Sequence, residues 1–169
     1  DENVKLKTVV DQLRDAYGKQ IAPFHLPLHE DGKFVGFVNV VKMEGRRFTN
    51  MSEYEACEIP EYTEKNLGIA RDALMEAVAE TSEEYMERYF SGEEFTQDEI
   101  YTAVQTHVSE GNIVPVMMGS GLNCQGFNAL LNAIDRYFPA PDYFECVGVD
   151  VSTGERFTAK YNEDVSLSA

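Results

Sequence analysis

Residues 64–110 carry helical periodicity, and it gives the clearest constraint on how this chain folds. Apolar residues recur there at the three- and four-residue spacing of a single helix face. They are Leu67, Ala70, Leu74 and Val78. We therefore predict a helix that begins near residue 64 and packs this face inward.

Start and stop signals divide the rest of this region. Thr81 with Glu84, and Thr96 with Glu99, have the spacing of a capping box, which satisfies free N–H groups at a helix start. Glycine at positions 92 and 111 suits a helix end because it adopts the left-handed conformation found there. We expect a second helix, or a restart of the first, to about residue 90, and a further helix from 96 to 110.

Residues 21–43 change to the period of two that is typical of strands. Apolar residues alternate with polar ones over 24–29, and a second apolar run covers 34–41. Asp31-Gly32 between them is a hairpin turn signal. Pro23 and Pro27 indicate that the first strand is irregular or lies at an edge. The polar stretch 44–62 is expected to form turns.

The remaining segments predict a helix at 4–17, a short buried strand at 113–118, a tight loop at 119–121 and a helix at 125–138. The inward face of the last helix is predicted to comprise Phe127, Leu130, Leu131, Ile134 and Phe138. A hairpin is expected from 144 onward, with Ser152-Thr153-Gly154 as its turn. The overall prediction is an α/β fold with an α+β segment.

The charge balance limits the classes of partner that the chain can bind. The chain of 169 residues has 30 acidic and 14 basic residues, for a net charge of −16. Such a surface repels phosphate backbones, so sequence-specific nucleic-acid binding is not expected, whereas a basic protein surface would be attracted. The alternative is that the acids only maintain solubility. No apolar run is long enough to span a bilayer, so no membrane partner is expected.

Cysteine and histidine show no metal-binding spacing. The cysteines are Cys57, Cys124 and Cys146, and the histidines are His25, His29 and His107. An odd number of widely spaced cysteines is typical of reduced thiols in a cytoplasmic protein. We expect His25 and His29 to share a solvent-facing strand edge and His107 to pack on its helix. No metal site is predicted.

No catalytic motif is present. The chain has no phosphate loop, no G-x-G-x-x-G, no HExxH and no G-x-S-x-G elbow, so no catalytic residue is assigned. One loop, at 119–122, joins a predicted buried strand to a helix. A loop at the carboxyl end of a parallel strand can offer backbone N–H groups to an acceptor such as guanine O6, whereas the amino group of adenine would oppose them. Many such turns bind nothing.

The order of several motifs resembles bacterial elongation factor G, a translational GTPase, or one of its paralogues. The matching segments are Leu26-Pro-Leu-His, Phe34-Val-Gly-Phe-Val-Asn-Val-Val, the acidic stretch 77–100, Ile113-Val-Pro-Val, Gly119-Ser-Gly-Leu and Arg136-Tyr-Phe-Pro-Ala-Pro. They cover nearly the whole chain. Both ends of the sequence look like cuts in a longer protein.

The resemblance implies a domain plan. Residues 1–20 and 111–140 would be the C-terminal part of a P-loop GTP-binding domain, and 21–110 the inserted G′ subdomain. Residues 141–169 would be a linker and the first strands of a β-rich second domain. The phosphate loop, the switches and the Mg²⁺ ligands of the family would precede Asp1. The chain alone should thus not hydrolyse GTP, although the intact cytoplasmic protein would bind GTP or GDP with Mg²⁺ and act as a GTPase.

The resemblance also implies roles for two groups of residues. Ser120, Gly121 and Leu122 would form the guanine-contacting loop. The clustered acids Glu83, Glu84 and Glu87 would lie on the helix similar to the one that meets the basic C-terminal domain of the ribosomal stalk protein. The ribosome is therefore the expected partner, and tRNA–mRNA translocation the expected role of the intact protein.

The sequence departs from the family at two points of the loop. Gly121 replaces the usual alanine, and residues 123–126 are less basic than usual. These differences suggest a divergent branch, and relatives that protect ribosomes or release peptides are alternatives. A non-enzymatic acidic interaction module is a further alternative. A self-standing small enzyme has almost no support because no nucleophile or metal cluster is present.

Overall fold

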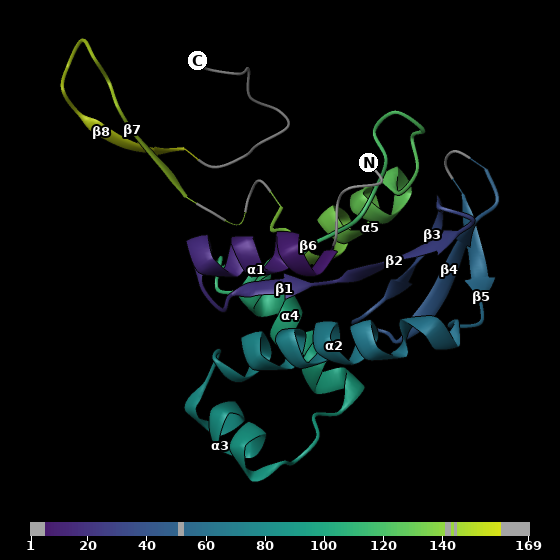
Figure 1. Cartoon of the computed structure of the whole chain (residues 1–169). Helices are drawn as coiled ribbons and strands as arrows, with labels where there is room; N and C mark the ends of the chain where they lie inside the picture. Colours follow the sequence, from purple (N-terminus) through teal and green to yellow (C-terminus); the bar gives the residue numbers. More distant parts are fainter. Residues whose placement is uncertain (1–5, 51–52, 141–142, 144, 160–169) are drawn as a thin grey trace. The chain divides into compact units, whose positions relative to one another are not determined.

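The computed structural model describes residues 6–50, 53–140, 143 and 145–159. The chain divides into two units, Asp1–Tyr137 and Phe138–Ala169. The fold is mixed α/β, with helices and several separate sheets (Figure 1). The helices are α1 (Leu6–Tyr17), α2 (Glu64–Ala79), α3 (Glu83–Ser91), α4 (Gln97–Ser109) and α5 (Phe127–Tyr137), with a 3-10 turn at Glu61–Thr63.

The strands of the first unit form two sheets. A parallel pair joins β1 (Ile21–Pro23) to β6 (Val114–Val116). An antiparallel sheet has the order β2 (His25–Glu30), β3 (Lys33–Asn39), β4 (Glu44–Phe48) and β5 (Tyr54–Cys57). Asp31 and Gly32 make the tight turn between β2 and β3, both at positive φ, as their sequence predicts. As expected from its prolines, β2 pairs on one side only among the described strands.

The polar stretch 44–62 was predicted to form turns, and that prediction was wrong. It contains β4 and β5, which pair antiparallel from Gly45↔Cys57 to Phe48↔Tyr54. These strands have few buried side chains, so they lack the apolar alternation by which a strand is detected in sequence. The sheet is held instead by cross-strand aromatic contacts, including Phe37 against Tyr54 at 5.4 Å between ring centroids.

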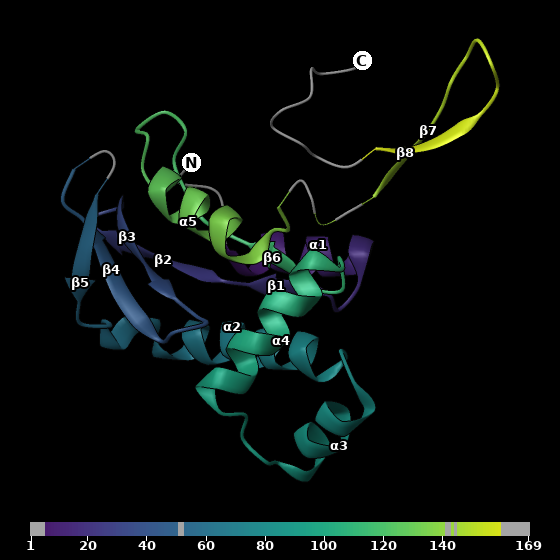
Figure 2. The same cartoon turned by 180° about the vertical axis from the view of Figure 1, so that it is seen from behind.

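The core of this unit forms where α2 and α4 meet the strands β1 to β3 (Figure 2). The predicted inward face of α2 is confirmed, because Leu67, Ala70, Leu74 and Val78 are all buried. From α4, Ile100 and Val104 join the same cluster. Burial of these apolar side chains is the main source of stability for such a layer.

One of the two predicted capping boxes is confirmed. Thr96 and Glu99 form it at the start of α4, and Gly92 ends α3 at a φ of 77°. The box predicted at Thr81 and Glu84 was wrong. The Thr81 hydroxyl donates back to the Val78 carbonyl at 2.6 Å and so closes α2, while Ser82 caps α3 by accepting the Tyr85 N–H.

Helix α5 presents a different face to the core than its sequence predicts. The small residues Ala129 and Ala133 and the ring of Tyr137 are buried. The predicted inward residues are 43–58% exposed; they are Phe127, Leu130, Leu131, Ile134 and Phe138. Small side chains let the helix approach its neighbours closely, so the large apolar ones turn outward. Strand β6 also differs from its prediction as a buried strand, because it is only partly covered and Val114 is 36% exposed.

The second unit contains the predicted hairpin. Strands β7 (Cys146–Val149) and β8 (Arg156–Ala159) pair antiparallel. In their connection, the Asp150 carboxylate accepts N–H groups from Ser152 and Thr153. Gly154 adopts a φ of 74° there, which an L side chain would disfavour. The predicted turn at Ser152-Thr153-Gly154 is therefore confirmed.

Candidate functional site

The loop predicted to contact guanine is a tight hairpin at residues 120–125 that follows β6. Ser120 and Gln125 pair across it: the Ser120 N–H donates to the Gln125 carbonyl at 2.9 Å, and the Gln125 N–H returns a bond at 3.1 Å. The next helix, α5, begins at Phe127. The loop thus lies at the carboxyl end of a parallel strand, where ligands of α/β folds commonly bind.

Two glycines allow the arms of this hairpin to approach each other. A Cβ on Gly119 would lie 2.9 Å from the Gln125 carbonyl oxygen, and one on Gly126 would lie 2.8 Å from the Met118 oxygen. Gly126 also has a φ of 88°. The role of Gly126 was missed in the sequence, although a glycine just before a helix is the signal that marks it.

The three predicted contact residues offer different groups. The Ser120 N–H is already bonded within the hairpin, and its hydroxyl accepts the Asn123 N–H at 3.3 Å. The N–H groups of Gly121 and Leu122 have no acceptor in the part of the chain that the structure describes. The Leu122 side chain is 95% exposed. The loop therefore presents two adjacent backbone donors to whatever approaches its tip.

The predicted partner-binding acids are brought together on α3. Glu83 and Glu84 lie in its first turn and Glu87 one turn further, and all three side chains are exposed. None forms an ion pair with another described residue. Glu83 and Glu84 also suit the positive end of the helix dipole, which gives them a structural role besides any binding role.

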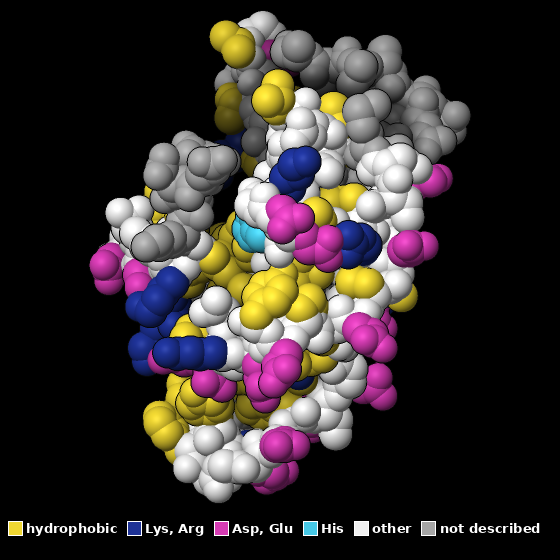
Figure 3. Space-filling model, turned by 45° about the vertical axis from the view of Figure 1, so that its right-hand side comes forward, with side chains coloured by type: hydrophobic (Ala, Val, Ile, Leu, Met, Phe, Trp, Pro, Cys, Tyr) yellow, Lys and Arg dark blue, Asp and Glu magenta, His cyan; other side chains and the backbone are white. Residues whose placement is uncertain are grey.

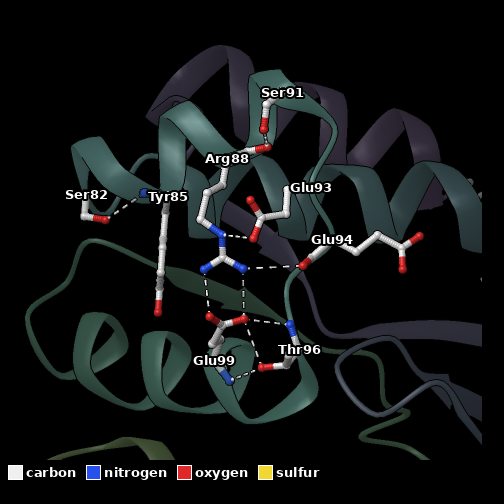
Figure 4. A network of polar contacts seen from close by, with 8 residues as sticks. All are labelled: Ser82, Tyr85, Arg88, Ser91, Glu93, Glu94, Thr96 and Glu99. Carbon is white, nitrogen blue, oxygen red and sulfur yellow. Dashed lines mark hydrogen bonds and ion pairs between the residues drawn. The ribbon is translucent and has the colours of Figure 1, made fainter.

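Arg88 fixes α3 against the start of α4, and sequence reasoning missed it (Figure 4). Its Nη1 lies 2.7 Å from Glu99 Oε1 and its Nη2 3.2 Å from Glu99 Oε2. Its Nε lies 2.9 Å from Glu93 Oε1, as an ion pair without the alignment of a hydrogen bond. The guanidinium also lies 5.1 Å from the centre of the Phe95 ring. Arg88 is the one basic residue between 83 and 99, which is the signal that could have identified it.

Glu99 takes part in two interactions at once. Besides the pair with Arg88, its carboxylate accepts the N–H of Thr96 at 2.8 Å. The hydrogen bond from Arg88, followed by the bonds from Thr96, lowers the pKa of Glu99 to about 2. The carboxylate is therefore ionised at neutral pH, and the acidic helix is presented on a fixed support.

The described surface offers further hollows but no metal site. A groove of about 650 Å³ runs between α1 and α2, with Leu6, Val10 and Ile69 among its apolar residues. Figure 3 shows hydrophobic side chains gathered in the middle of one face, with acidic and basic ones around them. Among the described residues, no group of three or more His, Cys, Asp or Glu could hold a metal ion. His29 is exposed and His107 lies 2.9 Å from Glu110.

His25 does not share the exposed edge with His29, contrary to the prediction. It is 3% exposed, and its ring stacks on Phe37 at 4.1 Å. The pairing of β2 with β3 shifts register between Leu28 and His29. The extra residue of this bulge is on β3, so it does not turn the two histidines to opposite faces, and His29 contacts Phe34 at 5.9 Å between ring centroids. His25 is covered because it lies at the end of the strand where α5 residues such as Ala129 and Ala133 come close.

None of the helices that the structure describes combines the length and apolar composition that crossing a bilayer requires. No family model matches the chain. A crystal structure of a protein from Thermus thermophilus is similar in fold, with a TM-score of 0.71 and 32% sequence identity. The match covers 83% of this chain but 21% of the Thermus protein. The chain therefore spans about a fifth of the length of that protein.

Proposed function

We propose that this chain is part of a ribosome-dependent GTPase of the elongation factor G type, a cytoplasmic protein. The intact protein would couple GTP binding and hydrolysis to tRNA–mRNA translocation. In this proposal the loop at 120–122 contributes to guanine recognition. The phosphate loop, the switches and the Mg²⁺ ligands belong to other parts of the protein.

The observation that carries the proposal is the pair of N–H groups at Gly121 and Leu122 that have no acceptor among the described residues. Guanine O6 accepts hydrogen bonds at that edge of the base, whereas adenine presents an amino group. A buried donor left facing another donor costs roughly 1–3 kcal/mol. Two such donors are enough to favour GTP over ATP strongly.

The outward apolar face of α5 supports the same proposal. Leu131 is 58% exposed and Ile134 43% exposed, on a helix whose other face is packed. Contiguous apolar surface of this kind is normally covered by another part of the protein or by a partner. The remainder of a GTP-binding domain, with its parallel sheet continuing from β1 and β6, is the cover we propose.

The acidic helix supports a role at the ribosome. Glu83, Glu84 and Glu87 are exposed and without ion pairs among the described residues, so a basic surface would relieve their mutual repulsion. We assign them to contact the lysine-bearing C-terminal domain of the ribosomal stalk protein. An acidic interaction module without GTPase activity would use the same residues, and measurements on loop variants of the intact protein distinguish the two functions.

The test uses the intact protein with Leu122 replaced. Leu122→Pro removes one of the two free N–H groups, and Leu122→Ala keeps it while removing the same exposed side chain. We expect Leu122→Pro to raise the KM for GTP by about 5- to 100-fold, from the loss of one buried hydrogen bond, and to leave the KM for ATP unchanged. Leu122→Ala should hydrolyse GTP as the wild type does.

Ribosomes should stimulate hydrolysis by the wild-type intact protein strongly. Absence of GTP hydrolysis with and without ribosomes would refute the proposal. Equal effects of the proline and alanine variants would remove the loop from guanine recognition.

A further inference from the structure

A second pocket lies between α5 and the four-stranded sheet, away from the loop at 120–125 and from α3. Its volume is about 300 Å³, which accommodates a small organic molecule. Its lining is mixed, with polar and charged side chains beside four aromatic ones, which are Phe24, Phe37, Tyr54 and Tyr137. The side chain of Asn132 on α5 donates to the Tyr54 hydroxyl at 3.3 Å and so links the helix to the sheet beside it.

Basic side chains also line this pocket, in a protein of net charge −16. Lys42 and Arg136 form no ion pair with a described carboxylate, whereas Arg46 pairs with Glu44 at 2.5 Å. Lys42 Nζ lies 6.0 Å and the Arg136 Cζ 5.3 Å from the centre of the same ring, that of Tyr101. Arg136 also donates a hydrogen bond to the Tyr101 hydroxyl. Two cations without a carboxylate partner among the described residues thus lie beside the same ring at the pocket.

His25 supplies an unpaired acceptor. It lines the pocket, and its Nδ1 is buried without a hydrogen-bond partner in the described chain. Burial holds its pKa at about 4, despite a hydrogen bond with the Met118 backbone, so the ring is neutral at pH 7. The ring nitrogen that bonds the Met118 backbone carries the proton, so Nδ1 has a lone pair that can accept a hydrogen bond.

These features select a ligand class. We infer that the pocket binds a small aromatic carboxylate that also carries a neutral hydroxyl or amide donor. Its carboxylate pairs with Lys42 and Arg136, and its ring packs against the aromatic side chains. Its donor reaches His25 Nδ1, which is closed to solvent here, as the side chains around it move aside. Asp135 also lines the pocket, so a dense anion such as phosphate is disfavoured relative to a monoanion with a neutral donor.

The test titrates the 169-residue chain with 4-hydroxyphenylacetate and follows backbone amide shifts by NMR. Phenylacetate, which lacks the hydroxyl, is the matched probe. We expect saturable shifts at residues of α5 and of strands β3 and β4, with the hydroxylated probe binding about 5-fold more tightly because it satisfies His25. Absence of saturation up to about 10 mM, the weak end of specific binding, would overturn the inference.

Two variants test the assigned contacts. Lys42→Gln should weaken binding of both probes by about 5-fold or more, since a desolvated charged hydrogen bond is lost, and Lys65→Gln on the exposed surface of α2 should not. His25→Phe, which keeps a ring beside Phe37, should abolish the advantage of the hydroxylated probe. Equal weakening by Lys42→Gln and Lys65→Gln would reduce the binding to general charge attraction and overturn the site. This comparison stands even if His25→Phe does not fold.

Discussion

Arg88 and Glu99 are joined by a two-pronged ion pair, with Nη1 to Oε1 at 2.7 Å and Nη2 to Oε2 at 3.2 Å. The pair links α3 to the first turn of α4. Because Glu99 is also the acidic member of the capping box, the same carboxylate organises a helix start and anchors the neighbouring helix. The position of the acidic surface of α3 therefore depends on the cap of α4.

Removal of that cap should be measurable as a loss of stability. Thr96→Ala deletes the hydroxyl that accepts the Glu99 N–H at 3.3 Å, and we expect the free energy of unfolding to fall by about 1 kcal/mol. Thr102→Ala, at an exposed position within α4, is the control and should be neutral or slightly stabilising. Urea denaturation of both variants checks this, and equal losses would contradict a capping role.

The buried His25 predicts a pH dependence of stability. Its folded-state pKa of about 4 lies below its ordinary value of 6.5, so the unfolded chain takes up a proton first as pH falls. The stability is fully present above pH 6.5 and declines by roughly 3 kcal/mol by pH 4. His25→Phe should remove this slope, and the exposed His29→Gln should retain it, in urea denaturation at a series of pH values.

The titration of Glu76 and Glu99 does not obscure the loss of stability that His25 causes between pH 6.5 and 4.5. Interactions lower the pKa of Glu76 and Glu99 below their ordinary value of 4.5, so the stability they add is lost only as pH falls below that value. Measurements between pH 6.5 and 4.5 therefore report mainly on His25. A flat profile for the wild type over this range would show that His25 is not held neutral.

Replacement of two glycines by alanine should change the stability of the chain in opposite directions. A Cβ on Gly36 would lie 2.1 Å from the Arg46 carbonyl oxygen, so Gly36→Ala must separate β3 from β4 and should cost about 3 kcal/mol. Gly68 lies within α2 with no atom within 4 Å of its added Cβ. Gly68→Ala should stabilise the chain by about 1 kcal/mol, because alanine favours the helix. Thermal unfolding of the two variants would test the contrast.

Neutralising the acids of α3 should slow association with a basic partner. A triple variant with Glu83, Glu84 and Glu87 changed to Gln is expected to lower the association rate for the stalk protein C-terminal domain by about 3- to 10-fold at low salt, with a smaller effect on dissociation. The matched control changes the exposed acids Glu55, Glu58 and Asp72 to Gln. Stopped-flow measurements would refute a local role if both triple variants behaved alike.

Local signals predicted much of the fold, because local chemistry forms those parts. The apolar face of α2, the Asp31-Gly32 turn and the cap at Thr96 each depend on residues close in sequence. The capping box predicted at Thr81 and Glu84 has the same spacing as the one at Thr96, but that prediction was wrong. Spacing alone cannot say whether a threonine hydroxyl serves the helix that follows it or the one that precedes it.

Contacts between distant residues were not predictable in the same way. The inward face of α5 was predicted from its apolar pattern, but Ala129 and Ala133 pack inward because close approach requires small side chains. The loop at 119–122 could be singled out because its residues are consecutive. The pocket between α5 and the four-stranded sheet could not be singled out in this way, because it combines His25 of β2 with Lys42 and with Arg136, which is far from both in sequence.

The pairing of Ile21 with Val114 has a consequence for the order of folding. These partners are about 90 residues apart, so joining β1 to β6 closes a long loop at a considerable cost in chain entropy. The segment between them must become compact before that contact is favourable, and such non-local pairings slow folding. The hairpin at 120–125 follows β6 directly, so we expect it to reach its final place among the last events of folding.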